Sequence, residues 1–519
     1  MTRAVARGHW LRRTQAPGRA ALDTARGAYA PSTPIYAFRL YPGTMVKGRE
    51  ASAQVATGVP AKTLAGPVHA RPGTRLRAPP FVNPLLNCQI QTPPQVVKLV
   101  WTHLHRRRPS VASVIDLGAG DGRFAFQGRY ESYVGCEIDP SQEPAPDLPG
   151  NARIIHKCVL DVDGTYEAAV GNPPFIRNQD IKSDWRERAA KLIRDGTGAD
   201  VHGLANLYVY FMWLATLKTE PDGIAVLVVP YEWVSRPTAQ ALREYLAVQG
   251  WHVEVHRIPD GLHVFDEVKT TASITIIDKG ASRRNGSFAF YEVRSDLKSR
   301  PKKGPTPAGR RPLAYVPGRG DVYPSRGFSP GSQAVFCLTD DERREAGLRL
   351  SQVLPAVTSL RHVPTNVRVL DADAFEAYYV DAEKKCWLLR TGHDRISRAA
   401  KTWLKKAPGA VKTNSTCAKR DPWYRYADPP APRVLYAAGF TRRRPKIVVN
   451  GCGARNVGSV HGLFGPVSLP RENELLRHLR ELDFASRIVP HSGGFRKIEV
   501  AQMNGVVTAF YSRNGSAHA

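Results

Sequence analysis

Short apolar runs alternate with helical patterns between about residues 81 and 280. Four of these runs are short enough for buried strands: Val111–Asp116, Tyr133–Glu137, Ala168–Val170 and Gly223–Pro230. Residues Leu207–Leu217 instead place apolar side chains on one face of a helix. Two further runs, His252–Ile258 and Ser273–Asp278, could close a sheet as a hairpin. This alternation predicts a mostly parallel sheet with helices on both of its faces.

The pattern changes on either side of this region. Residues 1–80 are basic and lack a periodic apolar pattern, which predicts a disordered arm. Their start also resembles an organelle transit peptide, and translation from an internal start at Met45 is a further alternative. Residues 281–335 are rich in Lys, Arg, Pro and Gly, which is typical of a linker that can follow a phosphate backbone.

A second ordered region is expected over residues 336–510, with α+β character. Residues Asp340–Val353 have a helical pattern. Strands are expected near Arg433–Tyr436 and Lys446–Asn450, among many turns.

Charge and composition restrict the classes of partner. The formal net charge is +28 at pH 7, which indicates a polyanionic partner such as nucleic acid or an acidic membrane surface. No apolar run approaches the roughly 20 residues that span a bilayer. The seven cysteines are scattered and never form C-x-x-C pairs, so neither a disulfide framework nor a metal site is expected. A reducing cytoplasm fits this usage.

The most informative motif is Asn172-Pro173-Pro174-Phe175, directly after the apolar run Ala168–Val170. Proline fixes φ and keeps the preceding residue out of helical conformations. The Asn172 amide oxygen and the Pro173 carbonyl can therefore serve as two acceptors for a planar amino group, and Phe175 can stack on its ring. Since Asn-Pro-Pro is also an ordinary turn, the residues that precede it decide between the two interpretations.

A glycine-rich turn precedes the motif, after the strand that ends at Asp116. Gly118 and Gly120 would let the backbone approach a ligand at the carboxyl edge of a parallel sheet. Glu137 ends the next strand, where acids bind ribose hydroxyls. Arg123 stands where a dinucleotide loop would have its last glycine, and Asp116 would receive a cationic amino group. These features favour S-adenosylmethionine, a ligand with a ribose, an amino-acid group and no phosphate.

The ordered set of motifs resembles the DNA adenine N6-methyltransferases of type II restriction–modification systems, in their gamma arrangement. The resemblance covers residues 88–280. It implies that Thr92 contacts the methionine end of S-adenosylmethionine and that Asp116, Gly118, Gly120 and Glu137 bind the rest of it. Asn172, Pro173, Pro174 and Phe175 fall on the catalytic motif. Phe265 matches the segment that supplies a second aromatic ring against a flipped-out base.

One departure concerns the acid that usually binds the adenine of the cofactor. The family places this Asp early in the third segment, where the present chain reads Ile155-His156-Lys157-Cys158. Asp161 is the candidate, and a surface acid without this role is the alternative.

The resemblance also implies a domain layout. Residues 81–280 would form a Rossmann-like S-adenosylmethionine-dependent methyltransferase domain with a mostly parallel, seven-stranded sheet. Residues 336–510 would form an α+β target-recognition domain, in which Trp423 and Arg425 are candidates for DNA contact. The basic residues 281–335 would link the two domains, after the arm of residues 1–80.

The implied activity is site-specific methylation of the N6 amine of a flipped-out adenine in duplex DNA. A cognate restriction endonuclease would be the functional partner, and the enzyme would act as a monomer in a bacterial or archaeal cytoplasm, at the nucleoid. The alternatives are methyltransferases acting on RNA N6-adenine, guanine N2, protein glutamine or cytosine N4. A DNA-binding protein with a degenerate site is the non-enzymatic alternative. The pattern assigns no recognition sequence.

Overall fold

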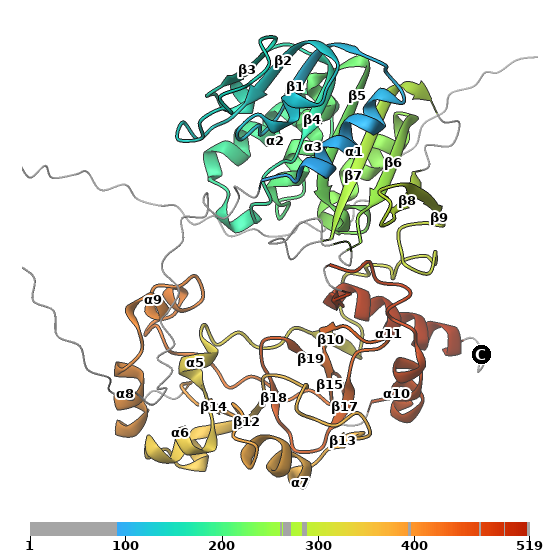
Figure 1. Ribbon diagram of the computed structural model, residues 1–519. Coiled ribbons are helices and arrows are strands. Elements are labelled where there is room, and N and C mark those ends of the chain that lie inside the picture. Colours follow the sequence, from blue (N-terminus) through green and yellow to red (C-terminus); the bar gives the residue numbers. More distant parts are fainter. Residues whose placement is uncertain are drawn as a thin grey trace, which may run out of the picture. The chain divides into compact units, whose positions relative to one another are not determined.

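The computed structural model describes residues 91–259, 262, 271–282, 288–392, 396–466, 469–491 and 494–515 (Figure 1). These all belong to the compact unit Ala78–Ala519. The predicted arm of residues 1–80 lies outside the described residues.

A nine-stranded sheet organises the first part of the described chain, in the order β3-β2-β1-β4-β5-β7-β6-β8-β9. Its strands are β1 Val111–Asp116, β2 Tyr130–Cys136, β3 Ala152–Ile155, β4 Tyr166–Gly171, β5 Thr219–Pro230, β6 Trp251–Arg257, β7 Ala272–Ser282, β8 Ala289–Val293 and β9 Ser299–Lys302. β1 pairs in parallel with β2 and β4, and β4 with β5. β7 lies antiparallel between β5 and β6, which confirms the expected pairing of the last two runs.

The sheet is larger than the seven strands expected from the sequence. β8 and β9 come from the stretch that was predicted to be a linker, and β8 pairs in parallel with β6. Val293 in β8 is buried and belongs to the core of the sheet. The short apolar segment of β8 lies among Lys and Arg residues, and the local composition therefore concealed a strand that tertiary pairing stabilises.

Two cores cover the two faces of the sheet, because successive residues of a strand point to opposite sides. In β4, Ala168 and Val170 pack with helix α1 (Pro94–His105), whereas Ala169 packs with α3 (Leu207–Lys218). The helices α2 (Ser183–Thr197) and α4 (Gln240–Val248) contribute to the α3 side. α3 is buried along nearly its whole length, since its residues are apolar on every face.

The later part of the chain is α+β. Its strands form a sheet of order β10-β19-β15-β17-β13, another of order β11-β14-β12-β18, and the pair β16-β20. These strands are β10 Tyr323–Ser325, β11 Cys337–Leu338, β12 Val353–Val357, β13 Val369–Leu370, β14 Trp387–Leu389, β15 Val434–Ala437, β16 Gly439–Phe440, β17 Ile447–Asn450, β18 Arg455–Asn456, β19 Val460–Phe464 and β20 Arg496–Lys497. The helices are α5 Gln333–Phe336, α6 Asp340–Glu345, α7 Ala372–Phe375, α8 Arg398–Lys405, α9 Gly409–Lys412, α10 Glu472–Glu481 and α11 Val500–Gly515.

The helix expected over Asp340–Val353 is shorter than predicted. It ends at Glu345, and Gly347 follows with φ of 65°, a conformation that stops a helix. Val353 already begins β12.

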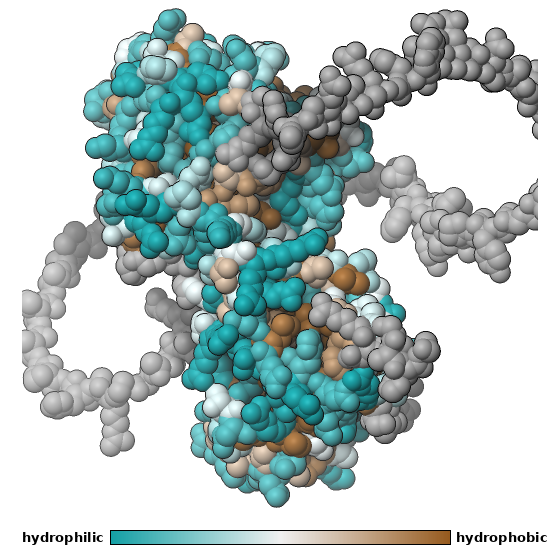
Figure 2. Space-filling view, turned by 90° about the vertical axis from the view of Figure 1, so that its right-hand side faces the viewer, coloured by the Kyte–Doolittle hydropathy of each residue, from teal (hydrophilic) through white to brown (hydrophobic). Residues whose placement is uncertain are grey.

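Hydrophilic residues cover most of the face seen in Figure 2. Among the described helices, none is both long and apolar enough to cross a membrane.

Candidate active site

The parallel strands β1, β2 and β4 bring three predicted residues to one edge of the sheet. Asp116 pairs in register with Gly135 of β2 and with Val170 of β4. The residues that follow these strands are the glycine-rich turn, Glu137 and Asn172. This edge is where ligands bind in parallel α/β sheets.

Glu137 connects two loops of this edge. Its Oε2 accepts a hydrogen bond of 2.9 Å from the Gly120 N–H, and its Oε1 accepts one of 2.9 Å from the Asp139 N–H. A carboxylate has about four acceptor positions, so Glu137 can still accept from hydroxyl groups of a ligand. Gly120 has φ of 54°, and a Cβ added there would meet no atom within 4 Å. The turn is therefore open on the side of Gly120.

Asp116 lies beneath the turn and is fully buried. The Tyr133 hydroxyl donates to its Oδ2 over 2.6 Å, and the Gly118 N–H lies 3.4 Å from Oδ1. Burial raises the pKa of Asp116 to about 7, although these hydrogen bonds oppose the rise. A Cβ added at Gly171 would lie 2.4 Å from Asp116 Oδ1, so glycine is required there. Contact of Asp116 with a cofactor amine stays a prediction.

Asn172 is joined to Thr92, the residue two positions before α1. Its Nδ2 donates to Thr92 Oγ1 over 3.1 Å. Its Oδ1 is buried and has no hydrogen-bond partner among the described residues. A buried acceptor without a hydrogen-bond partner destabilises the folded protein by about 1–3 kcal/mol. A ligand that donates a hydrogen bond to this oxygen would remove that cost, so the oxygen is a candidate ligand contact.

Pro174 lies near the glycine-rich turn, and Phe175 contacts α3. A Cβ added at Gly118 would lie 3.5 Å from Pro174 Cδ and 3.9 Å from Phe211 Cε1. The ring of the half-buried Phe175 meets Tyr208 edge to face, with centroids 6.3 Å apart. The structure thus brings the predicted motif and the predicted glycine-rich turn into direct proximity.

The other predicted residues lie elsewhere. Asp161 is exposed and forms an ion pair with Arg188 of α2. Phe265 lies outside the described residues. Trp423 packs edge to face with Phe336 in the later α+β part, and Arg425 is exposed there. No described contact joins these residues to Asn172.

Two residues of the site had no assigned role in the sequence. Tyr133 was visible only as part of an apolar run, and its partner Asp116 became evident from the pairing of β1 with β2. Arg123 was noted only as a missing glycine, yet its Nη1 donates to the Thr92 carbonyl over 2.7 Å.

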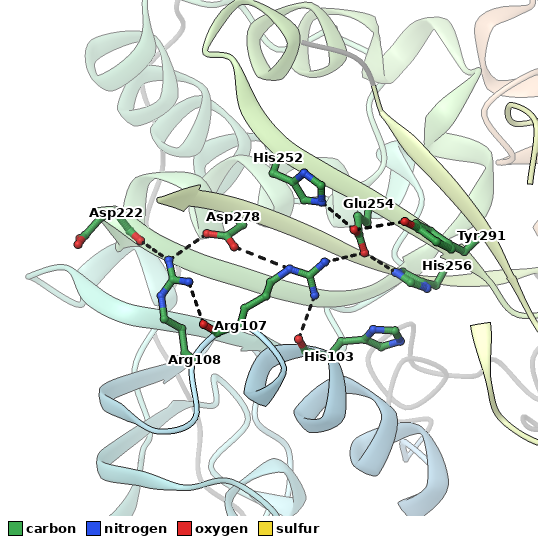
Figure 3. Close-up of polar contacts among 9 residues, drawn as sticks. All are labelled: His103, Arg107, Arg108, Asp222, His252, Glu254, His256, Asp278 and Tyr291. Atoms are coloured by element: carbon green, nitrogen blue, oxygen red, sulfur yellow. Dashed lines mark hydrogen bonds and ion pairs between the residues drawn. The ribbon is translucent and has the colours of Figure 1, made fainter. Parts of the chain in front are cut away.

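A cavity of about 370 Å³ lies away from this edge, at the C-terminal end of α1. A cluster of ion pairs contributes to its wall: Glu254 accepts from Arg107 over 2.6 Å, from His252 over 2.7 Å and from His256 over 3.0 Å (Figure 3). Since Thr92 and Asn172 meet at the opposite end of α1, this cavity is separate from the candidate active site. In the described residues no cluster of His, Cys, Asp and Glu could hold a metal ion.

Comparisons with known proteins match two families along the chain. The Eco57I restriction-modification methylase family matches residues 142–265. The C-terminal domain of the type II methyltransferase M.Eco57I matches residues 323–480.

Individual relatives are similar at modest identity. The type II methyltransferase M.XamI of Xanthomonas campestris pv. amaranthicola is 24% identical over 422 residues, which cover 74% of this chain and 76% of the relative. M.BanIII of Aneurinibacillus aneurinilyticus is 24% identical over 114 residues, or 22% of this chain and 18% of the relative.

Among solved structures, the type IIL restriction-modification enzyme MmeI, in complex with DNA, aligns with a TM-score of 0.50 and 12% identity. The alignment covers 81% of this chain and 64% of that enzyme, so the chain spans less than two thirds of its length. At this identity the likeness concerns the fold alone.

Proposed function

We propose that this chain, which belongs to the type II restriction–modification methyltransferases, methylates the N6 amine of adenine in a short duplex DNA sequence. The observation that carries the proposal is the Oδ1 of Asn172, which is buried and has no hydrogen-bond partner among the residues that the structure describes. An exocyclic amine offers two N–H donors, and the Pro173 carbonyl, next in the chain, is the second acceptor. Together the two acceptors would draw the nitrogen lone pair out of conjugation and toward the methyl donor.

The residues of the edge fit S-adenosylmethionine as that donor. Glu137 has acceptor positions left for ribose hydroxyls, and the turn is open at Gly120. Gly118 lies against Pro174, so a ligand on the turn would adjoin the Asn-Pro-Pro-Phe motif. When bound, S-adenosylmethionine supplies a methyl group on a positively charged sulfur. The protein contributes mainly by positioning the amine.

The target base must leave the duplex to reach Asn172, which costs a few kcal/mol of unstacking and unpairing. Stacking on Phe175 would return about 1–3 kcal/mol. Phe265 is proposed as the second aromatic contact, on the basis of the resemblance.

No cysteine is needed as a nucleophile. Cys136 lies beside the site at the end of β2, where burial raises the pKa of its thiol to about 12. Such a thiol is protonated at neutral pH and is a weak nucleophile.

We further propose that the region after residue 336 recognises the DNA sequence. The net charge of +28 favours a polyanion, and the exposed Arg425 would contact phosphate or a guanine edge. Trp423 packs against Phe336, so a DNA contact through its ring would use only the part left exposed. Methylation would protect DNA from a cognate restriction endonuclease, and the enzyme would act as a cytoplasmic monomer.

The test is to express the chain in a host that lacks DNA methylation and to analyse the DNA. Nucleosides from digested DNA are quantified by mass spectrometry, and native DNA is sequenced to locate the modified sites. N6-methyladenine at one short sequence supports the proposal, and its absence in the Asn172→Ala strain supports the assigned role. N4-methylcytosine would overturn the base assignment, and unmodified DNA together with methylated RNA would overturn the substrate.

A further inference from the structure

Helix α8 and the segment that follows it carry positive charge without any acidic residue. Residues 396–420 contain seven Lys or Arg and no Asp or Glu. Five of the seven are exposed: Arg398, Lys401, Lys405, Lys406 and Lys419. The preceding ion pair in the chain joins Arg390 to Asp428 over 2.7 Å, and none of the five takes part in an ion pair within the described part of the chain.

The fold of α8 (Arg398–Lys405) places its three cations on one side. At 3.6 residues per turn, positions 398, 401 and 405 share a face of the helix. Ala400 and Leu404 are buried in the core on the opposite face. Trp403 Nε1 also donates to the Val335 carbonyl over 2.8 Å, so the helix is fixed with its charged face toward solvent.

The stability of α8 does not account for these charges. Arg398 is the first residue of the helix, where the helix dipole disfavours a cation, and the first turn contains no acid. Only Lys405, in the last turn, has a position that the dipole favours. The charges on this face therefore attract an anionic partner without stabilising the helix as a set.

The exposed cations of α2 provide a contrast. Lys191 pairs with Asp195, and the Arg194 Nε lies 2.6 Å from a carboxylate oxygen of Asp200. The charges on α2 are thus balanced by neighbouring carboxylates, whereas those on α8 are not. The two helices differ in pairing, since their cations are exposed in both.

Two other cations of the segment stabilise the fold. Arg420 Nη1 donates to the Pro330 carbonyl over 2.7 Å, and its guanidinium lies 5.1 Å from the centroid of the Tyr426 ring. The half-buried Lys412 has its Nζ 5.9 Å from the centroid of the Trp423 ring. The charge that is available to a partner is therefore on the exposed side chains.

We propose that the α8 surface, formed by Arg398, Lys401 and Lys405, binds the phosphate backbone of duplex DNA. Charge complementarity identifies this partner, because a backbone of regularly spaced phosphates exchanges its counterions for exposed Lys and Arg side chains. Such contacts position a protein on the duplex and do not read bases. The inference rests on the proposed function of the region after residue 336 in DNA recognition.

Two double variants remove equal charge from the two helices. Arg398→Gln/Lys401→Gln changes the α8 surface, and Lys191→Gln/Arg194→Gln on α2 is the matched control, with one Lys and one Arg three positions apart in each. Binding to a fluorescein-labelled DNA duplex of random sequence is measured by anisotropy over a range of salt concentrations. The α8 variant should reduce the slope of log K against log salt by about 2 and weaken binding roughly tenfold at low salt. The α2 variant should keep the wild-type slope.

Other outcomes would overturn the inference. Equal losses in the two variants would show that overall charge, and not the α8 surface, determines binding. A wild-type slope in the α8 variant would show that this surface does not contact phosphate. A loss of binding to an RNA duplex, with DNA binding retained, would make RNA the partner. Both variants should keep the wild-type urea midpoint, because all four side chains are exposed.

A measurement on the wild-type protein tests the inference without any substitution. Lysines are acetylated with and without the DNA duplex, and the rates at single residues are followed by mass spectrometry. Lys401 and Lys405 should react more slowly in the presence of DNA, and Lys191 should not. Equal rates with and without DNA at Lys401 and Lys405 would refute the role of α8.

The same measurement separates this inference from the proposed function. A protein that methylates no DNA but protects Lys401 and Lys405 on the duplex would refute the proposed function alone. A protein that forms N6-methyladenine while both lysines stay unprotected would refute only the role of α8.

Discussion

The two ends of helix α1 carry polar clusters that differ in how completely their atoms are bonded. At the C-terminal end, both carboxylate oxygens of Glu254 have partners, from Arg107, His252 and His256. At the N-terminal end, the Nδ2 of Asn172 is bonded to Thr92, but its Oδ1 is buried and has no partner in the part of the chain that the structure describes. Within the described residues, both carboxylate oxygens of the first cluster have hydrogen-bond or ion-pair partners, whereas one amide oxygen of the second cluster has none.

This difference separates a stabilising cluster from a site of chemistry. The cluster around Glu254 borders a cavity of about 370 Å³ and contains His, Arg and Glu, so composition and volume would both suggest a binding site. Its carboxylate is nevertheless satisfied, and the negative end of the α1 dipole favours the cations that are already there. Buried atoms without a partner also occur elsewhere among the described residues, as at Tyr436 and Asn504. The candidate site is therefore indicated by the combination of the unpartnered Oδ1 with the Asn-Pro-Pro-Phe motif and the adjoining glycine-rich turn.

Asn172→Ala should give the largest effect, a loss of methyl transfer of roughly 10²–10³-fold, as for the removal of a preorganised hydrogen-bonding group. Thermal stability should change little, because the substitution removes one hydrogen bond, from Nδ2 to Thr92, together with a buried acceptor that has no partner among the described residues. Initial rates on unmethylated DNA measure the loss of methyl transfer, and the melting temperature measures the change in stability.

Asn151→Ala is the matched control, since it removes an exposed amide that bonds only to the Tyr130 carbonyl. Its rate should match that of the wild type. A strongly destabilised Asn172→Ala protein would break the comparison, because the active-site amide would then be structural as well.

Glu254→Gln should instead lower the stability of the fold and leave the rate of methyl transfer unchanged. Removal of this charge leaves the mostly buried Arg107 without its closest partner, and breaking such a pair costs about 3 kcal/mol or more. We expect a lower urea midpoint, with kcat retained at temperatures where the variant is folded. The exposed Glu244→Gln on α4 should shift stability by less than about 0.5 kcal/mol. If Glu254→Gln lost activity without losing stability, the cluster would have a functional role.

The titration of His103 gives a test of the cluster at the C-terminal end of α1 that depends on pH. Burial, helped by repulsion from His256, Arg106 and Arg107, lowers the pKa of His103 from 6.5 to about 3. Below pH 6.5 the unfolded chain binds a proton that the folded protein does not, so stability falls as the pH falls. The loss is about 1.4 kcal/mol per pH unit, or about 2 kcal/mol between pH 6.5 and 5.

His103→Leu should remove this part of the acid sensitivity. The facing Glu254 opposes the shift in the pKa of His103, and burial lowers the pKa of the neighbouring His256 as well, so some sensitivity should remain. Urea midpoints between pH 7 and 5 measure the change, and a slope equal to that of the wild type would contradict it.

Much of the catalytic sheet followed from local patterns. The runs at Val111–Asp116 and His252–Ile258 became β1 and β6 within a residue, because the first is mostly apolar and the second begins by alternating polar with apolar side chains, two patterns typical of strands. The prediction lacks β8, because its short apolar segment lies among Lys and Arg residues and only pairing with β6 makes it a strand. The helix after Asp340 was predicted too long, since an amphipathic pattern continued past the stop at Gly347.

The sequence predicts which residues meet at the candidate site, but not the hydrogen bonds between them. The proximity of the glycine-rich turn to Asn172 followed from parallel strands, whose ends meet at one edge. The link from Asp121 through Arg123 to Thr92 depends on how α1 packs, and no local pattern encodes it. Asp161 is a candidate by its position alone; the structure shows its ion pair with Arg188, and its contact with the cofactor adenine stays a prediction.

The titration of Asp116 should give the smallest effect on stability. Its pH dependence has the opposite sign to that of His103. Burial raises the pKa of Asp116 from 3.8 to about 7, so the folded protein holds a proton that the unfolded chain has lost. The stability from Asp116 is fully present below about pH 4 and is lost as the pH rises through 7. Between pH 6 and 8 the loss is about 1.4 kcal/mol.

Asp116→Asn removes this titration and keeps an oxygen that can accept from Tyr133. The variant should therefore gain stability relative to the wild type between pH 6 and 8, as urea midpoints at the two pH values would show. A constant difference between the two proteins would mean that Asp116 is already ionised at pH 6. Opposite pH slopes for Asp116 and His103 would instead indicate that the folded protein buries a neutral acid at the end of β1 and a neutral base in α1, because burial disfavours the charged form of each group.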